Sequence, residues 1–306
     1  MRTPRLALGL FVYNGQQHLA AAVESLLSQS MGDFVLDISD NGSTDQTEDI
    51  CRSYAAADDR VHYVRHDQNR GPTWNTNFVT QVSPDTEFFK WCAHDDVCEP
   101  TYLEQCVTEL DFLPEVVVSH TRARYIDEQG DEIMRSFRQQ DFTDDRPWMR
   151  FREVLLGEHD YTFIFGVIRR SALRRIRPFQ SVYAGDAVLL AELAFQGRFA
   201  ELPDHLCANR VHTARATASL PKGRSARTWA EWFGGSSRFA LWHTWEALRQ
   251  GISMAPLDAM AKARSYGVLA DWMALRWKGL GWELASDGRE AVAQRITAIG
   301  RGKPAR

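Results

Sequence analysis

Apolar runs and amphipathic segments alternate along the first two hundred residues of the chain. Residues 6–12 form a continuous apolar run, and apolar residues at helical spacing follow it at residues 19–27. A run of this length is typical of a strand buried on both faces. Strand, turn and helix recur in the same order from residue 34 and again from residue 61. This alternation predicts an α/β fold, a mostly parallel sheet with helices on both faces.

A fourth strand is expected at residues 87–93, and it runs directly into His94, Asp95 and Asp96. Open α/β sheets bind their ligands at the carboxyl ends of their strands. The two adjacent carboxylates therefore lie where a ligand is expected.

The middle of the chain continues the pattern less regularly. Strands are expected at residues 116–118 and 162–168, and a helix with an apolar face begins at Asp186. We therefore expect one α/β domain at residues 1–222.

The pattern changes after about residue 220, where no strand is expected. Seven of the ten tryptophans lie there, among Ala, Leu and Arg residues at helical spacing: Trp229, Trp232, Trp242, Trp245, Trp272, Trp277 and Trp282. We expect a helical C-terminal region at residues 223–306 that ends in a basic tail. Its tryptophans are expected mainly to pack between helices, and contact with a lipid surface or an acceptor is the alternative. Association between copies of the chain through these helices is compatible with the same pattern.

Charge, cysteines and hydropathy exclude several classes of protein. The net charge of -4 gives no basic field to attract nucleic acid, so no nucleic-acid partner is expected. The five scattered cysteines contain no CxxC pair, which favours a reducing cytoplasm. No apolar run reaches the ~18 residues of a membrane span. We expect a cytoplasmic protein without a spanning helix, and peripheral contact with the inner face of the membrane is compatible with the sequence.

The candidate chemistry concerns carboxylates at strand ends. Asp95 and Asp96 could be a solvated turn, but their place after an apolar strand suits Mg²⁺ or Mn²⁺, which bind few carboxylates together with substrate phosphates. His94 is expected to pack against the strand end in preference to binding a metal. Asp40 ends the second strand, where it could form an Asx-turn or accept the imide N–H of a uracil base.

Five motifs occur in order over roughly residues 5 to 110. They are Phe11-Val12-Tyr13-Asn14-Gly15, Ser25-Leu26-Leu27-Ser28-Gln29, Ser39-Asp40-Asn41-Gly42-Ser43-Thr44-Asp45, Asn69-Arg70-Gly71 with Asn77, and Asp95-Asp96. Together they resemble the ordered signature of family 2 glycosyltransferases of the GT-A fold. The resemblance continues more loosely at residues 165–171, 185–190 and 210–212, so that about 215 residues are covered in all.

The resemblance implies a GT-A fold, which is Rossmann-like, and a role for each matching residue. It divides the domain into a nucleotide-binding half at residues 1–110 and an acceptor and catalytic-base half at residues 111–222. The implied donor-binding residues are Val12, Tyr13 and Asn14, then Asp40 at N3 of the base, Arg70, Gly71 and Asn77 around the base and ribose, Asp95 near the sugar, and Arg210. Asp96 and His212 are the implied metal ligands. Asp186 is the implied catalytic base.

These roles imply an inverting transferase that moves a sugar from a nucleotide diphosphate donor, with Mn²⁺ or Mg²⁺ as cofactor. A UDP-sugar is the favoured donor and a dTDP-sugar the next, and the acceptor is a carbohydrate, a glycolipid or a small molecule. Three positions depart from the family pattern, because Phe11, Ala93 and Gly185 stand where proline, an acidic residue and glutamate are usual.

Two other functions fit the sequence less well. A sugar nucleotidyltransferase should have a glycine-rich loop with a lysine after the first strand, and residues 12–17 lack both features. A non-catalytic nucleotide-sugar-binding module should lack the base, whereas Asp186 is present.

Overall fold

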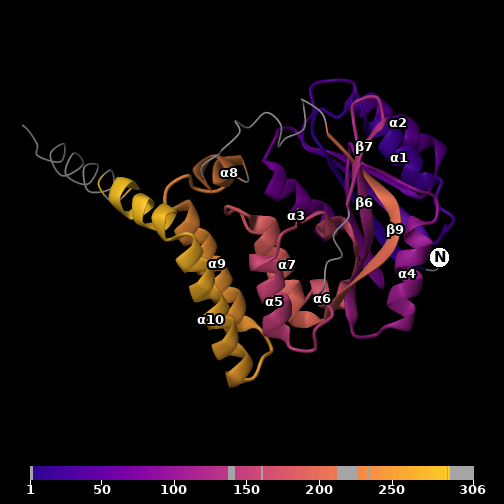
Figure 1. The fold of residues 1–306 in the computed structure, drawn as a ribbon. Coiled ribbons are helices and arrows are strands. Elements are labelled where there is room, and N and C mark those ends of the chain that lie inside the picture. The colour runs from indigo at the N-terminus through magenta and orange to yellow at the C-terminus, as the bar shows by residue number, and fades with distance from the viewer. Residues whose placement is uncertain are drawn as a thin grey trace, which may run out of the picture.

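In the described residues of this computed structural model, nine strands form one curled sheet (Figure 1). The structure describes residues 3–136, 142–159, 161–211, 226–232, 234–287 and 289. The strands follow the order β3-β2-β1-β4-β8-β6-β9-β5, with β7 paired to β6 outside this path.

The first half of the chain forms the parallel part of the sheet. The strands are β1 (Leu6–Val12), β2 (Phe34–Asp40), β3 (Val61–Arg65) and β4 (Phe88–Ala93), and the helices are α1 (Leu19–Leu27), α2 (Thr47–Ala57), α3 (Pro72–Val82) and α4 (Tyr102–Phe112). Alternate residues of β1 face opposite sides: Leu8 packs in the cluster that includes α1, and Ala7 packs in the cluster that includes Val79 of α3. Burial on both faces explains the continuous apolar run. Because β1 lies between β2 and β4 with all three parallel, their carboxyl ends meet at one edge.

The second half adds mixed strands to the same sheet. These are β5 (Val97–Cys98), β6 (Val116–Ile126), β7 (Glu132–Arg135), β8 (Val167–Arg169) and β9 (Arg198–Arg210). Strand β8 is antiparallel to both β4 and β6, whereas β9 is parallel to β6.

The strand predicted at residues 162–168 is mostly wrong. Residues Thr162–Phe165 form a 3₁₀ helix, η1, and only Val167–Arg169 form a strand. Tyr161 adopts a left-handed conformation with φ 60°, which turns the chain before η1 and lets Phe163 pack into the core. An apolar run alone cannot distinguish this turn from a strand.

The C-terminal region is helical in the described residues, as predicted. It contains α8 (Ala226–Trp232), α9 (Ala240–Met254) and α10 (Ala259–Leu275), which follow α5 (Pro147–Leu156), α6 (Arg170–Leu173) and α7 (Gly185–Gln196) of the preceding part. Helices α9 and α10 pack beside α5 and α7 (Figure 1). Leu248 and Leu269 belong to the same apolar cluster as Phe151 and Phe195, so the core continues from the sheet into these helices.

Within the described ranges, no helix is both long and apolar enough to cross a membrane.

Candidate active site

A cavity of about 880 Å³ opens at the carboxyl ends of β1, β2 and β4. Seven of the residues singled out from the sequence line it: Val12, Tyr13, Asn14, Gly71, Asp95, Asp96 and Asp186. Asp40, Arg70, Asn77 and Arg210 are not among the lining residues. His212 lies outside the described residues.

The loops after β1 and β2 are joined by hydrogen bonds, which explains why their motifs occur together. Asn14 has φ 51°, a left-handed conformation that asparagine tolerates. Its backbone N–H donates to Ser43 Oγ (2.9 Å), and its Oδ1 accepts the N–H of Thr44 (2.9 Å). The N–H of Gly15 donates to Thr47 Oγ1 (2.8 Å). These bonds hold Tyr13 and Asn14 at the cavity wall.

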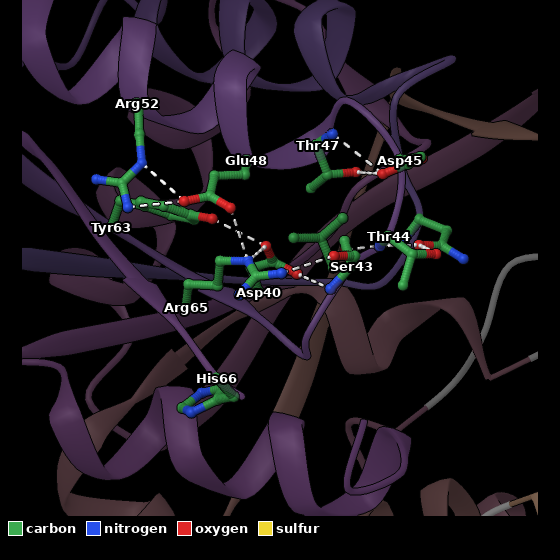
Figure 2. Close-up of polar contacts among 12 residues, drawn as sticks. Asp40, Ser43, Thr44, Asp45, Thr47, Glu48, Arg52, Tyr63, Arg65 and His66 are labelled. Carbon is green, nitrogen blue, oxygen red and sulfur yellow. Dashed lines mark hydrogen bonds and ion pairs between the residues drawn. The ribbon is translucent and has the colours of Figure 1, made fainter. Parts of the chain in front are cut away.

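Asp40 lies behind this wall and is fully buried. Its Oδ1 accepts the N–H of Ser43 (2.8 Å) and its Oδ2 accepts the hydroxyl of Tyr63 (2.8 Å), while Arg65 Nε lies 3.7 Å from Oδ2 (Figure 2). Burial, with the bond to Asp40, raises the pKa of Tyr63. The structure thus gives Asp40 a role in the turn after β2, which was one of the two alternatives that the sequence left open. The contact with N3 of the base, which the resemblance implies, stays a prediction.

The start of α3 forms another wall. Gly71 has φ 88°, a conformation that favours glycine, and it precedes Pro72 at the first turn. Asn41 Nδ2 donates to the Gly71 carbonyl (3.1 Å), and Asn41 Oδ1 accepts the N–H of Arg70 (3.0 Å). The guanidinium of Arg70 lies over the ring of Trp74, with Arg70 Cζ 4.6 Å from the ring centre.

Asn77 joins α3 to the loop that precedes α7. Its side chain donates to the carbonyl of Phe179 (2.9 Å) and accepts the N–H of the same residue (2.8 Å). Phe179 lines the cavity and Asn77 does not, so Asn77 positions a residue of the cavity wall without being part of that wall.

The Asp95–Asp96 loop is held by Arg210 at the end of β9. The backbone N–H of Arg210 donates to Asp96 Oδ1 (2.9 Å), and its Nε donates to the Asp95 carbonyl (3.1 Å). Its Nη1 donates to the carbonyl of Asp127 (2.9 Å). Arg210 is buried and therefore positions the loop from behind. The ring of His94 lies against Gly15, where a Cβ would come within 2.8 Å of it. This agrees with the expected packing role for His94.

Two adjacent carboxylates at the cavity fit a divalent cation that takes its remaining ligands from a substrate. In the described part of the chain, no group of three or more His, Cys, Asp or Glu side chains is arranged to hold a metal. A hard cation such as Mg²⁺ is commonly bound by one or two carboxylates together with phosphates, and Asp95 and Asp96 match that donor set.

Asp186 enters the cavity from the first turn of α7. Ala184 precedes it with φ 52°, and Gly185 is packed so tightly that a Cβ would lie 2.5 Å from the Gln180 carbonyl. The tight packing explains why glycine precedes Asp186 here. Burial raises the pKa of Asp186, although the N–H of Ala187 bonds to Oδ1 (2.8 Å) and opposes the shift. Burial and the charge of Asp186 raise the pKa of the nearby Tyr161 to about 12.

Several wall residues were not identified from the sequence. They are Asn75, Trp91, Tyr161 and Tyr183. Asn75 is buried, and it donates to the Ser39 carbonyl (2.9 Å) and accepts from Ser39 Oγ (2.5 Å). Asn75 could have been noticed in the sequence as a polar residue on the buried side of α3. Trp229 comes from α8, and the carbonyl of Tyr183 accepts the hydroxyl of Thr244 of α9 (2.7 Å), so the C-terminal region contributes to the site.

The chain is similar in sequence to several known proteins. The sequence profile of glycosyl transferase family 2 matches residues 9–177. EpsH of Bacillus subtilis (strain 168) is 30% identical over 127 residues, which cover 42% of this chain and 36% of EpsH. Chondroitin synthase of Escherichia coli is 27% identical over 136 residues, which cover 44% of this chain and 20% of that protein. The matched part thus spans well under half the length of these curated relatives.

Solved structures share the fold. A TarS fragment from S. aureus in complex with UDP-GlcNAc matches with a TM-score of 0.63 at 16% identity, over 90% of this chain and 73% of that chain. The mannosyltransferase PcManGT from Pyrobaculum calidifontis, in complex with GDP-Man and Mn²⁺, matches with a TM-score of 0.53 at 18% identity, over 99% of this chain and 82% of that chain. The predicted GT-A fold is therefore confirmed. Because the family profile covers more than half of the 306 residues, the chain belongs to glycosyl transferase family 2.

Proposed function

We propose that the chain moves a sugar from a nucleotide diphosphate donor to an acceptor hydroxyl, with inversion at the anomeric carbon. The observation that supports this best is the cavity, which contains Asp95 and Asp96 from the first half of the chain and Asp186 from the second. A single in-line displacement needs one base and a stabilised leaving group. These carboxylates can fill both roles.

The donor nucleotide would lie against Val12, Tyr13, Asn14 and Gly71, which line the cavity at the ends of β1 and the start of α3. Asp40 would support that part of the wall through the turn after β2, and Arg70 and Asn77 would do so through α3. A UDP-sugar is the favoured donor, and the UDP-GlcNAc complex of TarS supports uridine. A dTDP-sugar is next, because thymine carries the same imide N–H.

Asp96, with His212, would hold Mn²⁺ or Mg²⁺ at the diphosphate, and Asp95 would lie near the donor sugar. The bound cation supplies Lewis-acid stabilisation of the charge that develops on the leaving phosphate oxygens. Arg210 would keep the loop in place, since it bonds both aspartates. The Mn²⁺ in the PcManGT complex supports this proposal.

Asp186 would accept the proton of the acceptor hydroxyl as that hydroxyl attacks. Burial raises its pKa, which brings its basicity closer to what efficient proton transfer requires near neutral pH. It lies in the first turn of α7, in the second half of the chain, whereas the residues proposed to bind the nucleotide come from the first half.

The acceptor side of the cavity is rich in aromatic side chains. Tyr161, Phe179, Tyr183 and Trp229 all line it together with Asp186. Aromatic rings pack well against the C–H faces of pyranose rings, while their polar edges can hydrogen-bond. A carbohydrate, free or as the head of a glycolipid, therefore fits this side better than a small apolar acceptor.

Asp186→Asn tests the proposed reaction. We expect the rate of sugar release from a UDP-sugar, with water or a pyranoside as acceptor, to fall about 10²- to 10⁴-fold because the base is removed. The affinity for UDP should stay the same, because the nucleotide contacts are elsewhere. Asp59→Asn, at an exposed carboxylate, is the matched control. Unchanged turnover in Asp186→Asn would contradict the base role. UDP-sugar binding without any turnover in the unmodified chain would support a non-catalytic nucleotide-sugar-binding module instead.

A thermal-shift panel of UDP-, dTDP- and GDP-sugars, with Mn²⁺ and with EDTA, tests the donor and the metal. A ligand that binds the native state raises the melting temperature, and the rise grows with the logarithm of the ligand concentration relative to its Kd. We expect the largest shift with a UDP-sugar and Mn²⁺, and we expect Asp96→Asn to remove the part that depends on Mn²⁺. Equal shifts in Mn²⁺ and in EDTA would contradict the metal role.

A further inference from the structure

Two cysteines face each other beside the Asp95–Asp96 loop. Cys98 of β5 is the register partner of Cys207 of β9 in an antiparallel pair. The adjacent pair, Glu99 and Leu206, is bonded through Glu99 N–H to the Leu206 carbonyl (2.8 Å). Bonded and non-bonded pairs alternate along an antiparallel ladder, so Cys98 and Cys207 occupy a non-hydrogen-bonded position, where the Cα atoms lie about 4.5 Å apart. Disulfides bridge Cα atoms roughly 4.4 to 6.8 Å apart.

The two thiols also have room to move. Both line a void of about 10 Å³, together with buried Lys90 and with Asp96. A void of this size holds about one water molecule, which lets the sulfur atoms change rotamer. Ala93, Asp96 and Phe165 line both this void and the large cavity, so the two spaces adjoin. A small oxidant in the cavity therefore has a short route to the thiols.

The position of the pair gives a bond between them a definite effect. Strand β5 begins directly after Asp96, and β9 ends at Arg210, whose backbone N–H bonds Asp96 Oδ1. A covalent link between β5 and β9 would tie together the two segments that hold the loop.

We propose that Cys98 and Cys207 form an oxidisable thiol pair whose disulfide clamps the Asp95–Asp96 loop to β9. The oxidant class is a peroxide. One thiol, as its thiolate, attacks a peroxide oxygen, the O–O bond breaks, and a sulfenic acid and water form. The second thiol then attacks the sulfenic sulfur, the S–S bond forms, and a second water leaves. The two sulfurs together lose two electrons, which reduce the peroxide, and both thiol protons end in water.

Peptide mapping of the full chain after treatment with hydrogen peroxide tests the pair directly. We expect a Cys98–Cys207 cross-link as the main product, and a rise in melting temperature on the order of 5 °C, because the link closes a long loop. Dithiothreitol should reverse both changes. A main cross-link between other cysteines, or none at all, would overturn the proposal. The mapping uses the unmodified chain, so it does not depend on whether a variant folds.

Cysteine variants distinguish the effect of the Cys98–Cys207 disulfide from that of oxidation elsewhere in the chain. Cys98→Ser and Cys207→Ser should each abolish the shift in melting temperature, whereas Cys51→Ala, at a buried cysteine of α2, should keep it. A shift that persists in either serine variant would contradict the proposal. The mapping does not depend on transferase activity, so it stands or fails separately from the proposed function.

Protection of the thiols by bound nucleotide tests whether the peroxide reaches them through the large cavity. This experiment rests on the proposed function. UDP with Mn²⁺ should slow cross-linking several-fold because it fills the adjoining cavity. If UDP binds by thermal shift but leaves the rate of cross-linking unchanged, the proposed route through the cavity is wrong.

Discussion

Asp40 illustrates how a single residue can serve a site without lining it. Both of its carboxylate oxygens accept hydrogen bonds, from Ser43 N–H and from the hydroxyl of Tyr63. Loss of one such partner should lower the free energy of unfolding by roughly 1 to 3 kcal/mol or more, because the desolvation of the buried carboxylate is then no longer offset. The turn after β2, which carries Ser43, in turn holds Asn14 at the cavity.

Asp40→Asn and Tyr63→Phe separate support of the turn from direct contact with a base. If Asp40 acts through the turn, both variants should lower the melting temperature and should weaken UDP and CDP binding in parallel. If Asp40 accepts the imide N–H of uracil, only Asp40→Asn should weaken UDP relative to CDP, since cytosine has no N–H at N3. Calorimetric titration of both nucleotides into both variants distinguishes these outcomes.

The raised pKa of Asp186 predicts a pH dependence with a defined sign. The base must be ionised, so the rate should fall as pH drops through a value above the ordinary carboxyl pKa of 3.8. The folded chain holds this proton more tightly than the unfolded chain. Stability therefore decreases as pH rises through the interval between 3.8 and the raised pKa, and remains lower above it.

Asp186→Asn removes the ionisation and should raise the melting temperature at neutral pH while flattening this part of the stability profile. A pH–rate profile of the unmodified chain and melting curves of both proteins at several pH values provide the check. A lower melting temperature for Asp186→Asn at neutral pH would contradict the sign.

At the scale of single residues, Asp96 and Asp186 were named from motifs and do line the cavity, while their roles stay predictions. Sequence reasoning could not separate lining residues from those behind the wall. The resemblance implies that Asn77 and Arg210 bind the donor, yet neither is among the lining residues. Asn77 bonds the backbone of Phe179, and Arg210 bonds the Asp95 carbonyl and the Asp96 carboxylate. Spacing along the chain does not reveal which partner a buried polar side chain finds.

At the scale of elements, the alternation of apolar runs predicted β1 to β4 well, because strands buried on both faces show a continuous signal. Strands β5 and β9 were not identified. Strand β5 has only two residues, and β9 includes Pro203, Asp204 and His205, a polar interruption near its middle. Both lie beside the Asp95–Asp96 loop, so the contacts that hold this loop in place could not be predicted from the pattern of apolar residues.

Asn77→Ala tests how α3 controls the loop before α7. The change removes the two hydrogen bonds to Phe179 and should cost roughly 1 to 3 kcal/mol of stability. Because that loop leads to Asp186, turnover should fall more than UDP affinity does. Gln81→Ala, at an exposed position of the same helix, is the control and should change neither. Kinetics with UDP titration would show the split, and an equal loss of turnover and affinity would argue that Asn77 contacts the donor.

At the scale of the whole molecule, the C-terminal helices are packed into the core of the sheet-containing part. Glu192 of α7 accepts from Arg177 Nε (2.8 Å), and Arg177 Nη1 donates to Gln250 of α9 (2.9 Å). Trp229 lines the cavity from α8. The predicted boundary between residues 222 and 223 lies outside the described residues and remains a prediction. The packing predicts cooperative unfolding of both parts.

Leu248→Ala tests that cooperativity. Leu248 of α9 is 2% exposed within the cluster shared with Phe151 and Phe195, so the truncation should cost about 2 to 5 kcal/mol. If both parts unfold as one unit, the whole transition should move to lower temperature as a single step and UDP should shift it back. Met254→Ala, at a side chain 69% exposed on the same helix, should leave the transition where it is. An early separate step that UDP does not move would instead indicate that the helical region unfolds independently of the nucleotide site, and differential scanning calorimetry with and without UDP would resolve it.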